Sequence, residues 1–209
     1  DTKENPKPLP KTGKTVGIDL GIKTFITTSD NKKIENHKFL AKSQGKISRY
    51  QQVLSNKKKG SKRYYKHCKK LAKLYLKVTN QRNNLIHNVT KQLVTDYDVI
   101  CVETLNVKSM LQDPLFAKHL ADVSFGFFIE VITYKCTWYE KLLLKVDTYY
   151  PSSKTCSKCG HVKEKLNINE RIYNCENCGH TINRDLNAAI NIKTKALGDQ
   201  VLNEQLITV

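Results

Sequence analysis

The sequence is poor in the features that mark membrane and secreted proteins. No apolar run approaches the length of a membrane span, and the start, DTKENPKPLPKTGK, is too polar and proline-rich for a signal peptide. This start also lacks an initiator methionine. We therefore interpret residues 1–13 as a linker and allow that the chain is a fragment of a longer protein.

Acidic residues are few compared with basic ones. The 209 residues include 36 Lys and Arg but 19 Asp and Glu, which gives a formal net charge of +17. Such a surplus favours a polyanionic partner, and nucleic acid is the commonest one. The alternative is a basic, well-solvated surface. The lysine-rich run Lys57–Arg63 is accordingly either a solvated segment or a contact to phosphate.

The predicted elements alternate between strands and helices. The β-branched runs TVGIDLGI and TFITTS, and the segment after the Asp30-Asn31 turn, predict an antiparallel meander over about 14–40. The rest of the chain predicts a basic helical region over 45–95, a buried strand over 98–103, a helix over 124–142, a strand over 142–150 and a final helix over 185–197. This order is compatible with an RNase H-like α/β fold, a mixed sheet with helices in which the first strand, a central strand and the last helix converge.

Within the helical region 45–95, an apolar stripe is expected to lie on one long helix and to pack against the core. Six apolar residues recur at near-helical spacing, namely Leu71, Leu74, Val78, Leu85, Val89 and Leu93. For Tyr64, Tyr65 and Tyr75, which stand among the lysines, we favour packing over stacking on bases.

Three acidic residues stand at the ends of predicted elements, far apart in the sequence. They are Asp19 in TVGIDLGIKT, Glu103 in DVICVETLNV and Asp185 in INRDLNAAINI. Each alone is more often a surface residue. Together, on a basic chain, they predict a metal-dependent nuclease, because phosphodiester hydrolysis by two divalent cations needs hard oxygen ligands. We expect Mg²⁺ or Mn²⁺ at this trio, and the glycines that flank Asp19 would let its backbone approach a ligand closely.

Cysteine is sparse and its spacing is specific. Four of the seven cysteines form the pairs Cys156-x-x-Cys159 and Cys175-x-x-Cys178, and each pair continues as Cys-Gly-His. Four thiolates close a tetrahedral shell around Zn²⁺, so the spacing predicts a structural zinc site, with glycines at the tight turns. His161 and His180 are expected to be bystanders. The scattered Cys68, Cys101 and Cys136 are no disulfide framework, which indicates a reducing compartment.

The segment around the zinc site is rich in lysine. Its cationic residues include Lys154, Lys158, Lys163 and Lys165. The segment could therefore contact DNA or RNA, or its only role could be to stabilise the fold.

The chain resembles the C-terminal half of the OrfB/TnpB family of insertion-sequence proteins, relatives of the type V CRISPR effector nucleases. The matching stretches are GIDLGIKTF, KKKGSK, NQRNNLIH, VETLNVKSM, YPSSKTCSKCG and CENCGHTINRDLNAAINI, between about Val16 and Ile192. The resemblance implies a RuvC-like nuclease core over 14–150 and 183–209, split by a zinc-ribbon insert over 151–182 that binds the target nucleic acid. It also implies cytoplasmic, nucleoid-associated cleavage of a DNA target, directed by a guide RNA and dependent on a divalent metal. By motif position it assigns the catalytic acids to Asp19, Glu103 and Asp185.

Two departures from the family pattern keep alternatives open. The usual Asp-Arg-Asp is here Asn183-Arg184-Asp185, which retains the acid that the family uses. The family's N-terminal wedge and recognition regions are missing, so the chain is expected to be either an excised nuclease half or a reduced protein. One alternative function is a non-cleaving nucleic-acid-binding regulator, which should have lost one of the acids. Another is a strand-transfer transposase with the same acids.

Overall fold

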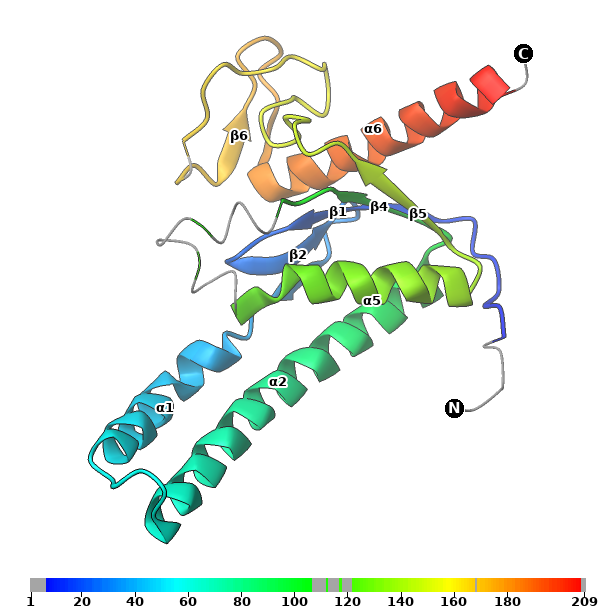
Figure 1. The fold of residues 1–209 in the computed structure, drawn as a ribbon. Helices are drawn as coiled ribbons and strands as arrows, with labels where there is room; N and C mark the ends of the chain where they lie inside the picture. The colour runs from blue at the N-terminus through cyan, green and yellow to red at the C-terminus, as the bar shows by residue number, and fades with distance from the viewer. Residues whose placement is uncertain (1–6, 107–111, 113–116, 118–121, 168, 208–209) are drawn as a thin grey trace.

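A five-stranded mixed sheet forms the centre of the computed structural model, which describes residues 7–106, 112, 117, 122–167 and 169–207 (Figure 1). The strands follow the order β3-β2-β1-β4-β5. Their bounds are Thr15–Leu20 for β1, Thr24–Thr28 for β2, Lys33–Glu35 for β3, Val99–Glu103 for β4 and Leu142–Val146 for β5. The first three strands form the predicted antiparallel meander, and β4 and β5 run parallel to β1.

Helices cover both faces of this sheet (Figure 1). Helix α2 (Lys62–Asp96) and helix α5 (Phe125–Trp138) bury apolar residues against one face, and α6 (Arg184–Ile207) lies on the other. Between β5 and α6 the chain forms a small separate hairpin, β6 (Ile172–Asn174) with β7 (Thr181–Asn183). None of the helices in the described residues combines the length and apolar character that a bilayer crossing needs.

The basic region after β3 is helical, as predicted, but it forms a helical hairpin, and the predicted apolar stripe lies on its long second helix. Helix α1 (Phe39–Ser55) is followed by a turn and then by α2, against which it packs. Gly60 takes a left-handed conformation with φ of +83°, and the Ser61 side chain accepts a hydrogen bond from Tyr64 N at 3.1 Å. The glycine in this conformation lets the chain turn after α1, and the serine N-cap starts α2.

The apolar stripe of α2 is confirmed in its second half. Val78, Val89 and Leu93 are buried, whereas the members nearer the turn are only partly covered by α1. The packing expected for the neighbouring tyrosines does not extend to Tyr65 and Tyr75, which are 58% and 41% exposed.

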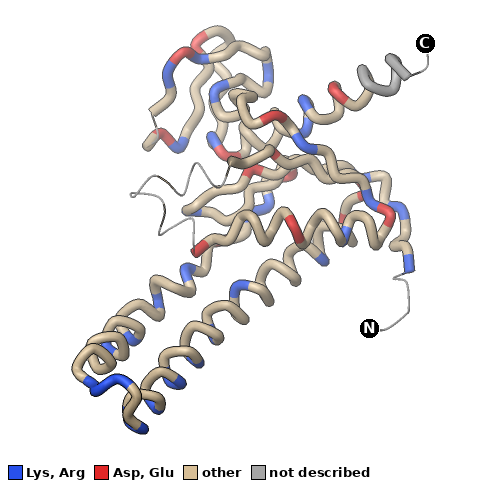
Figure 2. The backbone as a smooth tube through the Cα atoms, in the orientation of Figure 1, with Lys and Arg blue, Asp and Glu red and all other residues tan. Residues whose placement is uncertain are grey.

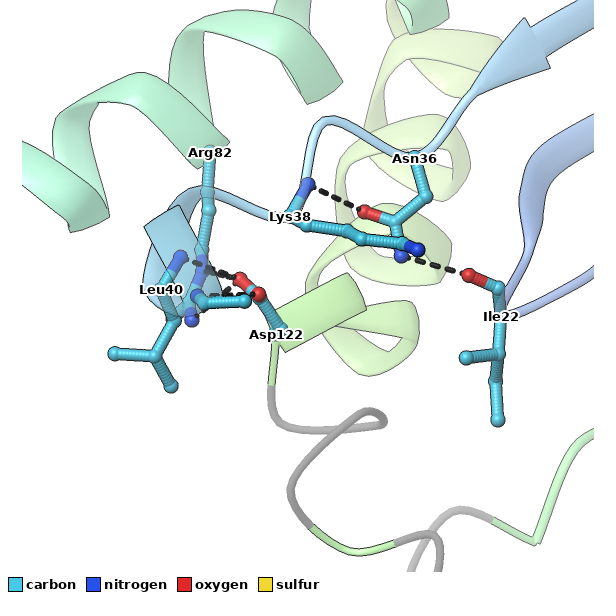
Figure 3. A network of polar contacts seen from close by, with 7 residues as sticks. Ile22, Asn36, Lys38, Leu40, Arg82 and Asp122 are labelled. Carbon is cyan, nitrogen blue, oxygen red and sulfur yellow. Dashed lines mark hydrogen bonds and ion pairs between the residues drawn. The ribbon is translucent and has the colours of Figure 1, made fainter. Parts of the chain in front are cut away.

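A carboxylate holds the base of the hairpin against the rest of the fold (Figure 3). The Asp122 side chain accepts hydrogen bonds from the backbone N–H groups of Leu40 and Ala41, at 3.0 and 3.2 Å. It also pairs with the Arg82 guanidinium of α2 at 2.8 Å, and both side chains are largely buried. Asp122 thus caps the start of α1 and joins it to α2 through a single side chain.

Glycine allows α6 to lie unusually close to β1. A Cβ at Gly17 would stand 2.1 Å from the Ala189 carbonyl oxygen and 2.7 Å from the Lys193 Cβ. At Gly21 a Cβ would stand 2.6 Å from the Thr24 carbonyl oxygen, in the turn between β1 and β2. The glycines that flank Asp19 therefore serve helix packing and a tight turn, and the close approach to a ligand that the sequence suggested stays a prediction.

Candidate functional site

Two of the predicted acids stand side by side at the carboxyl ends of parallel strands. Asp19 is the penultimate residue of β1, and Glu103 is the last residue of β4. The register pairs Ile18 with Val102, so the next residue of each strand is one of the two acids. Both side chains are partly buried.

Helix α6 brings the third acid to the same place. Gly17 faces Ala189 of α6, and Asp19 lies on the same face of β1 as Gly17 because side chains alternate along a strand. Two residues along a strand span about 6.6 Å, and four residues along a helix span about 6 Å. If α6 runs antiparallel to β1, Asp185 lies about as far from Ala189 along the helix as Asp19 lies from Gly17 along the strand, and in the same direction. The two acids are therefore neighbours.

Asn183, the residue that departs from the family pattern, is the N-cap of α6. Its side-chain oxygen accepts a hydrogen bond from Leu186 N at 3.2 Å. Asparagine and aspartate are about equal as N-caps, so the substitution preserves the start of this helix. Asp185 follows in the first turn, where a carboxylate is favoured by the helix dipole, and Arg184 pairs with it at 3.5 Å.

The three acids line one pocket of about 690 Å³. Their carboxylate oxygens are not as close together as the ligands of a single ion, because among the described residues only a cysteine cluster brings three or more ligand atoms within 4.8 Å of one another. Two ions held about 3.5–4 Å apart would not need all three carboxylates to converge on one point.

The electrostatics of the pocket favour a bound cation. Burial raises the pKa of Asp19 well above its ordinary value, and the nearby carboxylates of Glu103 and Asp185 raise it further, while Arg184 lowers it. Burial also raises the pKa of Glu103 to about 6. Asp19 and Glu103 are therefore harder to ionise than in water, and a divalent cation would relieve both the desolvation and the repulsion.

Basic side chains line the same pocket, and the sequence had pointed to only one of them, Lys154, as a contact to nucleic acid. They come from the turn after β1, the segment before α1, the zinc segment and the start of α6, and are Lys23, Lys38, Lys154, Arg171 and Arg184. No local motif marks Lys38 or Arg171, because they reach the pocket only through the fold. The pocket therefore offers positive charge around a cluster of carboxylates, which suits a phosphate diester bridged to cations.

Lys38 is held in this pocket by an unusual backbone conformation. Its φ of +48° is left-handed, and its N–H donates to the Asn36 side-chain oxygen at 2.9 Å (Figure 3). The Asn36 amide in turn donates to the carbonyl of Ile22 at 2.7 Å. The segment that carries Lys38 is thus tied to the turn that follows Asp19.

The four predicted zinc ligands come together in the segment between β5 and α6. Sγ of Cys156 lies 3.7 Å from Sγ of Cys178, and Sγ of Cys159 lies 3.6 Å from Sγ of Cys175. Sulfurs placed tetrahedrally about 2.3 Å from a zinc ion would lie about 3.8 Å apart. The four cysteines could therefore hold a structural metal such as zinc, and these separations exclude disulfides.

Each pair of cysteines folds as the same turn. Gly160 and Gly179 have φ of +76° and +68°, as expected of the Cys-Gly-His steps. The carbonyls of His161 and His180 each accept a hydrogen bond from the first cysteine N–H of their turn, at 2.8 Å in both. The two histidines thus shape the turns through their backbones, and they are not members of the thiol cluster.

Two buried asparagines of α6 attach this segment to the core. The Asn187 side chain accepts from Ser157 N at 2.9 Å and donates to the Thr155 carbonyl at 2.6 Å. The Asn191 amide donates to the carbonyls of Ser152 and Thr155, at 2.8 and 2.6 Å. The LNAAINI stretch matched the family, but sequence reasoning gave these amides no role.

Comparisons with known proteins agree along nearly the whole chain. The family model OrfB_IS605, described as "Probable transposase", matches residues 2–113, and the Cas12f1-like TNB domain matches 125–192. A Streptomyces pristinaespiralis protein named "Putative RNA-guided DNA endonuclease" is 34% identical over 190 residues, which are 91% of this chain and 47% of that protein. TnpB-like protein L79 of Acanthamoeba polyphaga mimivirus is also 34% identical over 190 residues, 84% of this chain and 36% of its own. This chain thus spans about half the length of such relatives, or less.

The fold has counterparts among solved structures. The cryo-EM structure of the Cas12f1-sgRNA-target DNA complex superposes with a TM-score of 0.63 at 23% identity, over 88% of this chain and 50% of that one. The mixed α/β fold is therefore similar to that of Cas12f1.

One of the sequence stretches that carry the family resemblance, VETLNVKSM, is described only as far as Asn106, because residues 107–111 lie outside the described part.

Proposed function

The chain belongs to the OrfB/TnpB family, and from that premise we propose that it is the nuclease portion of an RNA-guided DNA endonuclease encoded by a transposable element. The sheet order, with three antiparallel strands followed by two parallel ones, supports an RNase H-like, RuvC-like core. In this proposal the core comprises 14–150 and 183–209, with the zinc-ribbon insert over 151–182. Its partners are a guide RNA and a DNA target.

The catalytic proposal depends on a single observation. Carboxylates from three elements that are distant in sequence, Asp19 of β1, Glu103 of β4 and Asp185 of α6, line one basic pocket. They supply the hard oxygen donors that Mg²⁺ or Mn²⁺ prefers, and the raised pKa of Asp19 reflects burial and then repulsion by Glu103 and Asp185, both of which a cation would relieve. When bound, such cations would generate a nucleophilic water and stabilise the leaving oxygen.

The basic residues of the pocket would position the substrate. Lys23 and Lys38 come from one side of the acids, and Lys154 and Arg171 come from the zinc segment on the other. Contacts from both sides would orient the phosphate diester over the carboxylates and partly offset its charge. In this arrangement the zinc ribbon both contacts the nucleic acid and completes the active site.

The two alternatives make different predictions at this site. A non-cleaving regulator has no need for a buried acid cluster, in which burial raises the pKa of Asp19 and Glu103 and ionised carboxylates are therefore unfavourable without a cation. A strand-transfer transposase would retain the acids, and it differs in its product, because it joins DNA ends. The retained trio therefore favours an enzyme over a regulator, and product analysis separates hydrolysis from joining.

Alanine substitution of each acid tests the proposal. In the protein expressed from its full reading frame, with guide RNA, target DNA and Mg²⁺, Asp19→Ala, Glu103→Ala and Asp185→Ala should each abolish cleavage. Double variants should be no worse than single ones, because the trio acts as a unit. DNA affinity should persist. Glu130→Ala, which removes an exposed acid of α5, is the matched control and should cleave normally. Retained cleavage in an acid variant would remove the nuclease assignment, and joined products would favour the transposase.

A further inference from the structure

The helical hairpin carries almost all of the protein's excess charge. Between Glu35 and Asp96 the sequence contains sixteen Lys and Arg residues and no Asp or Glu, while the whole chain has a net charge of +17. Figure 2 shows these basic residues along both helices and at the turn between them, away from the sheet. Neither helix has an acidic residue in its first turn.

Seven of these cations lie on one face of α2. They are all exposed and follow one another at intervals of one, three or four residues: Lys62, Arg63, Lys66, Lys69, Lys70, Lys73 and Lys77. At 100° per residue they fall within an arc of about 120°, and at 1.5 Å per residue they span about 22 Å. We call this face the basic stripe. The opposite face of α2, which includes Val78, packs against α1 and the core.

The basic stripe is unfavourable to the helix that bears it. Lys66 and Lys70, and likewise Lys69 and Lys73, are like charges four residues apart, which destabilise a helix. Lys62 and Arg63 add positive charge at the helix N-terminus, where the dipole disfavours it. Among the described residues Arg82 is the only cation between Glu35 and Asp96 with an acidic partner within 4 Å. A bound polyanion would remove this repulsion.

We infer that the basic stripe binds the phosphodiester backbone of a double-stranded nucleic acid, as a contact separate from the catalytic pocket. A rod with cations at regular intervals fits a repeating line of phosphates and offers nothing that reads bases. The exposed Tyr65 and Leu76 lie beside the stripe, each 58% exposed, and add limited apolar contact. An anionic membrane fits less well, because a helix that binds membranes needs a free apolar face, and α1 covers that of α2.

The base of the hairpin would hold this contact in a fixed relation to the pocket. The Asp122–Arg82 pair, with the bonds of Asp122 to Leu40 and Ala41, fixes the start of α1 to α2, and Lys38, which lines the pocket, directly precedes α1. A duplex on the stripe would therefore have a defined position relative to the acids. This step rests on the proposed function, whereas the binding itself does not, since it needs neither cleavage nor a guide.

The test compares two triple variants with the same net charge. Lys66→Gln/Lys70→Gln/Lys73→Gln neutralises the stripe, and glutamine has nearly the helix propensity of lysine. The control, Lys11→Gln/Lys33→Gln/Lys145→Gln, neutralises three exposed lysines away from the hairpin. Binding of this chain to a 30-base-pair RNA duplex and a DNA duplex of the same sequence is measured from 50 to 300 mM KCl without Mg²⁺. Vesicles of phosphatidylserine and phosphatidylcholine are a third probe.

The stripe variant should bind duplexes at least tenfold more weakly at 100 mM salt, and its slope of log affinity against log salt should fall by up to about 2.7, or 0.9 per lost contact. The control should change both quantities much less. The stripe variant should melt no lower than the control, since it has lost like-charge repulsion. A greater loss for RNA than for DNA would indicate the guide, and the reverse would indicate the target.

Equal losses in the two variants would overturn the inference, because binding would then follow net charge alone. A stripe variant that loses vesicle binding but keeps duplex binding would overturn it in favour of a membrane. Neither result bears on the nuclease proposal, which the acid variants test in a separate assay.

Discussion

At position 17 even a methyl group has no room. A Cβ there would stand 2.1 Å from the Ala189 carbonyl oxygen, a backbone atom that can move only with α6. We predict that Gly17→Ala destabilises the protein by about 1–3 kcal/mol, as overpacking does, and lowers cleavage by shifting Asp185 away from Asp19. Chemical denaturation and a cleavage assay measure the two effects.

Gly45 supplies the control for that substitution. It lies within α1, and a Cβ there would meet no atom within 4 Å. Gly45→Ala should therefore stabilise the protein by about 0.5–1 kcal/mol. If both variants had the same stability, the close approach of α6 to β1 would not be the constraint that we describe.

The ion pair of Asp98 and Lys141 predicts a pH dependence of stability. Lys141 Nζ lies 2.6 Å from the Asp98 carboxylate, which also accepts from the N–H groups of Thr12 and Gly13. The Lys141 hydrogen bond, followed by those backbone bonds, lowers the pKa of Asp98 to about 2. A depressed folded-state pKa contributes stability above the unfolded-state value of about 3.9, and that stability is lost as the pH falls toward 2.

Asp98→Asn should consequently be less stable than the parent protein at pH 6. The difference should narrow between about pH 4 and pH 2, and melting temperatures across this range would measure it. A gap that stays constant down to pH 2 would mean that the carboxylate charge is not what stabilises the fold here.

At the scale of elements, the base of the hairpin depends on one carboxylate. Asp122→Ala would leave the largely buried Arg82 without its partner and remove two hydrogen bonds at the start of α1. Loss of one member of a buried pair typically costs about 3–5 kcal/mol, and we expect a loss of unfolding free energy in that range.

Asp96→Ala is the matched variant for a surface pair. Asp96 pairs with Lys32 at 3.4 Å, and the two side chains are 36% and 58% exposed. Its loss should change the unfolding free energy by less than about 1 kcal/mol. Similar losses in both variants would show that burial of the Asp122 pair has little effect.

The elements themselves were largely predictable, because they follow local rules. β-Branched runs identified β1 and β2, and an apolar run ending at Glu103 identified β4. The division between α1 and α2 was missed because Gly60 and Ser61 stand among lysines that fit a helix. The three acids were predicted from element ends and family motifs, and the structure brings them to one pocket.

The parts of the site that escaped prediction depend on tertiary structure. Lys38 and Arg171 reach the pocket from segments without a recognisable motif, and the ties of Asn187 to the zinc segment span about 30 residues. No periodicity or spacing in a single sequence encodes such contacts. These contacts depend on how α6, the sheet and the zinc segment are arranged in space.

At the scale of the whole molecule, metal binding and the active site should be linked. We predict one Zn²⁺ per chain, and Cys175→Ser should remove it and unfold the segment around β6 and β7, which is too small to bury a core of its own. Asn187 and Asn191 would then lose their carbonyl partners, and Arg171 would leave the pocket. Elemental analysis and a thermal melt would show both effects.

A scattered cysteine provides the comparison for the zinc prediction. Cys68 lies on α2, away from the thiol cluster, so Cys68→Ser should leave the zinc content unchanged. Purified parent protein without zinc, with four free thiols in the cluster, would contradict the prediction.

The exposed turn at the tip of the hairpin has a consequence for how the molecule can be divided. A trypsin-like protease would find three consecutive lysines there, Lys57, Lys58 and Lys59, at a point that touches neither the sheet nor the pocket. A nick at this point would leave Asp19 on one polypeptide and the other two acids on the second. The two pieces would stay together through the sheet and through α1 against α2. The gene could likewise be split at the same place, and cleavage would then require that two separately made halves meet.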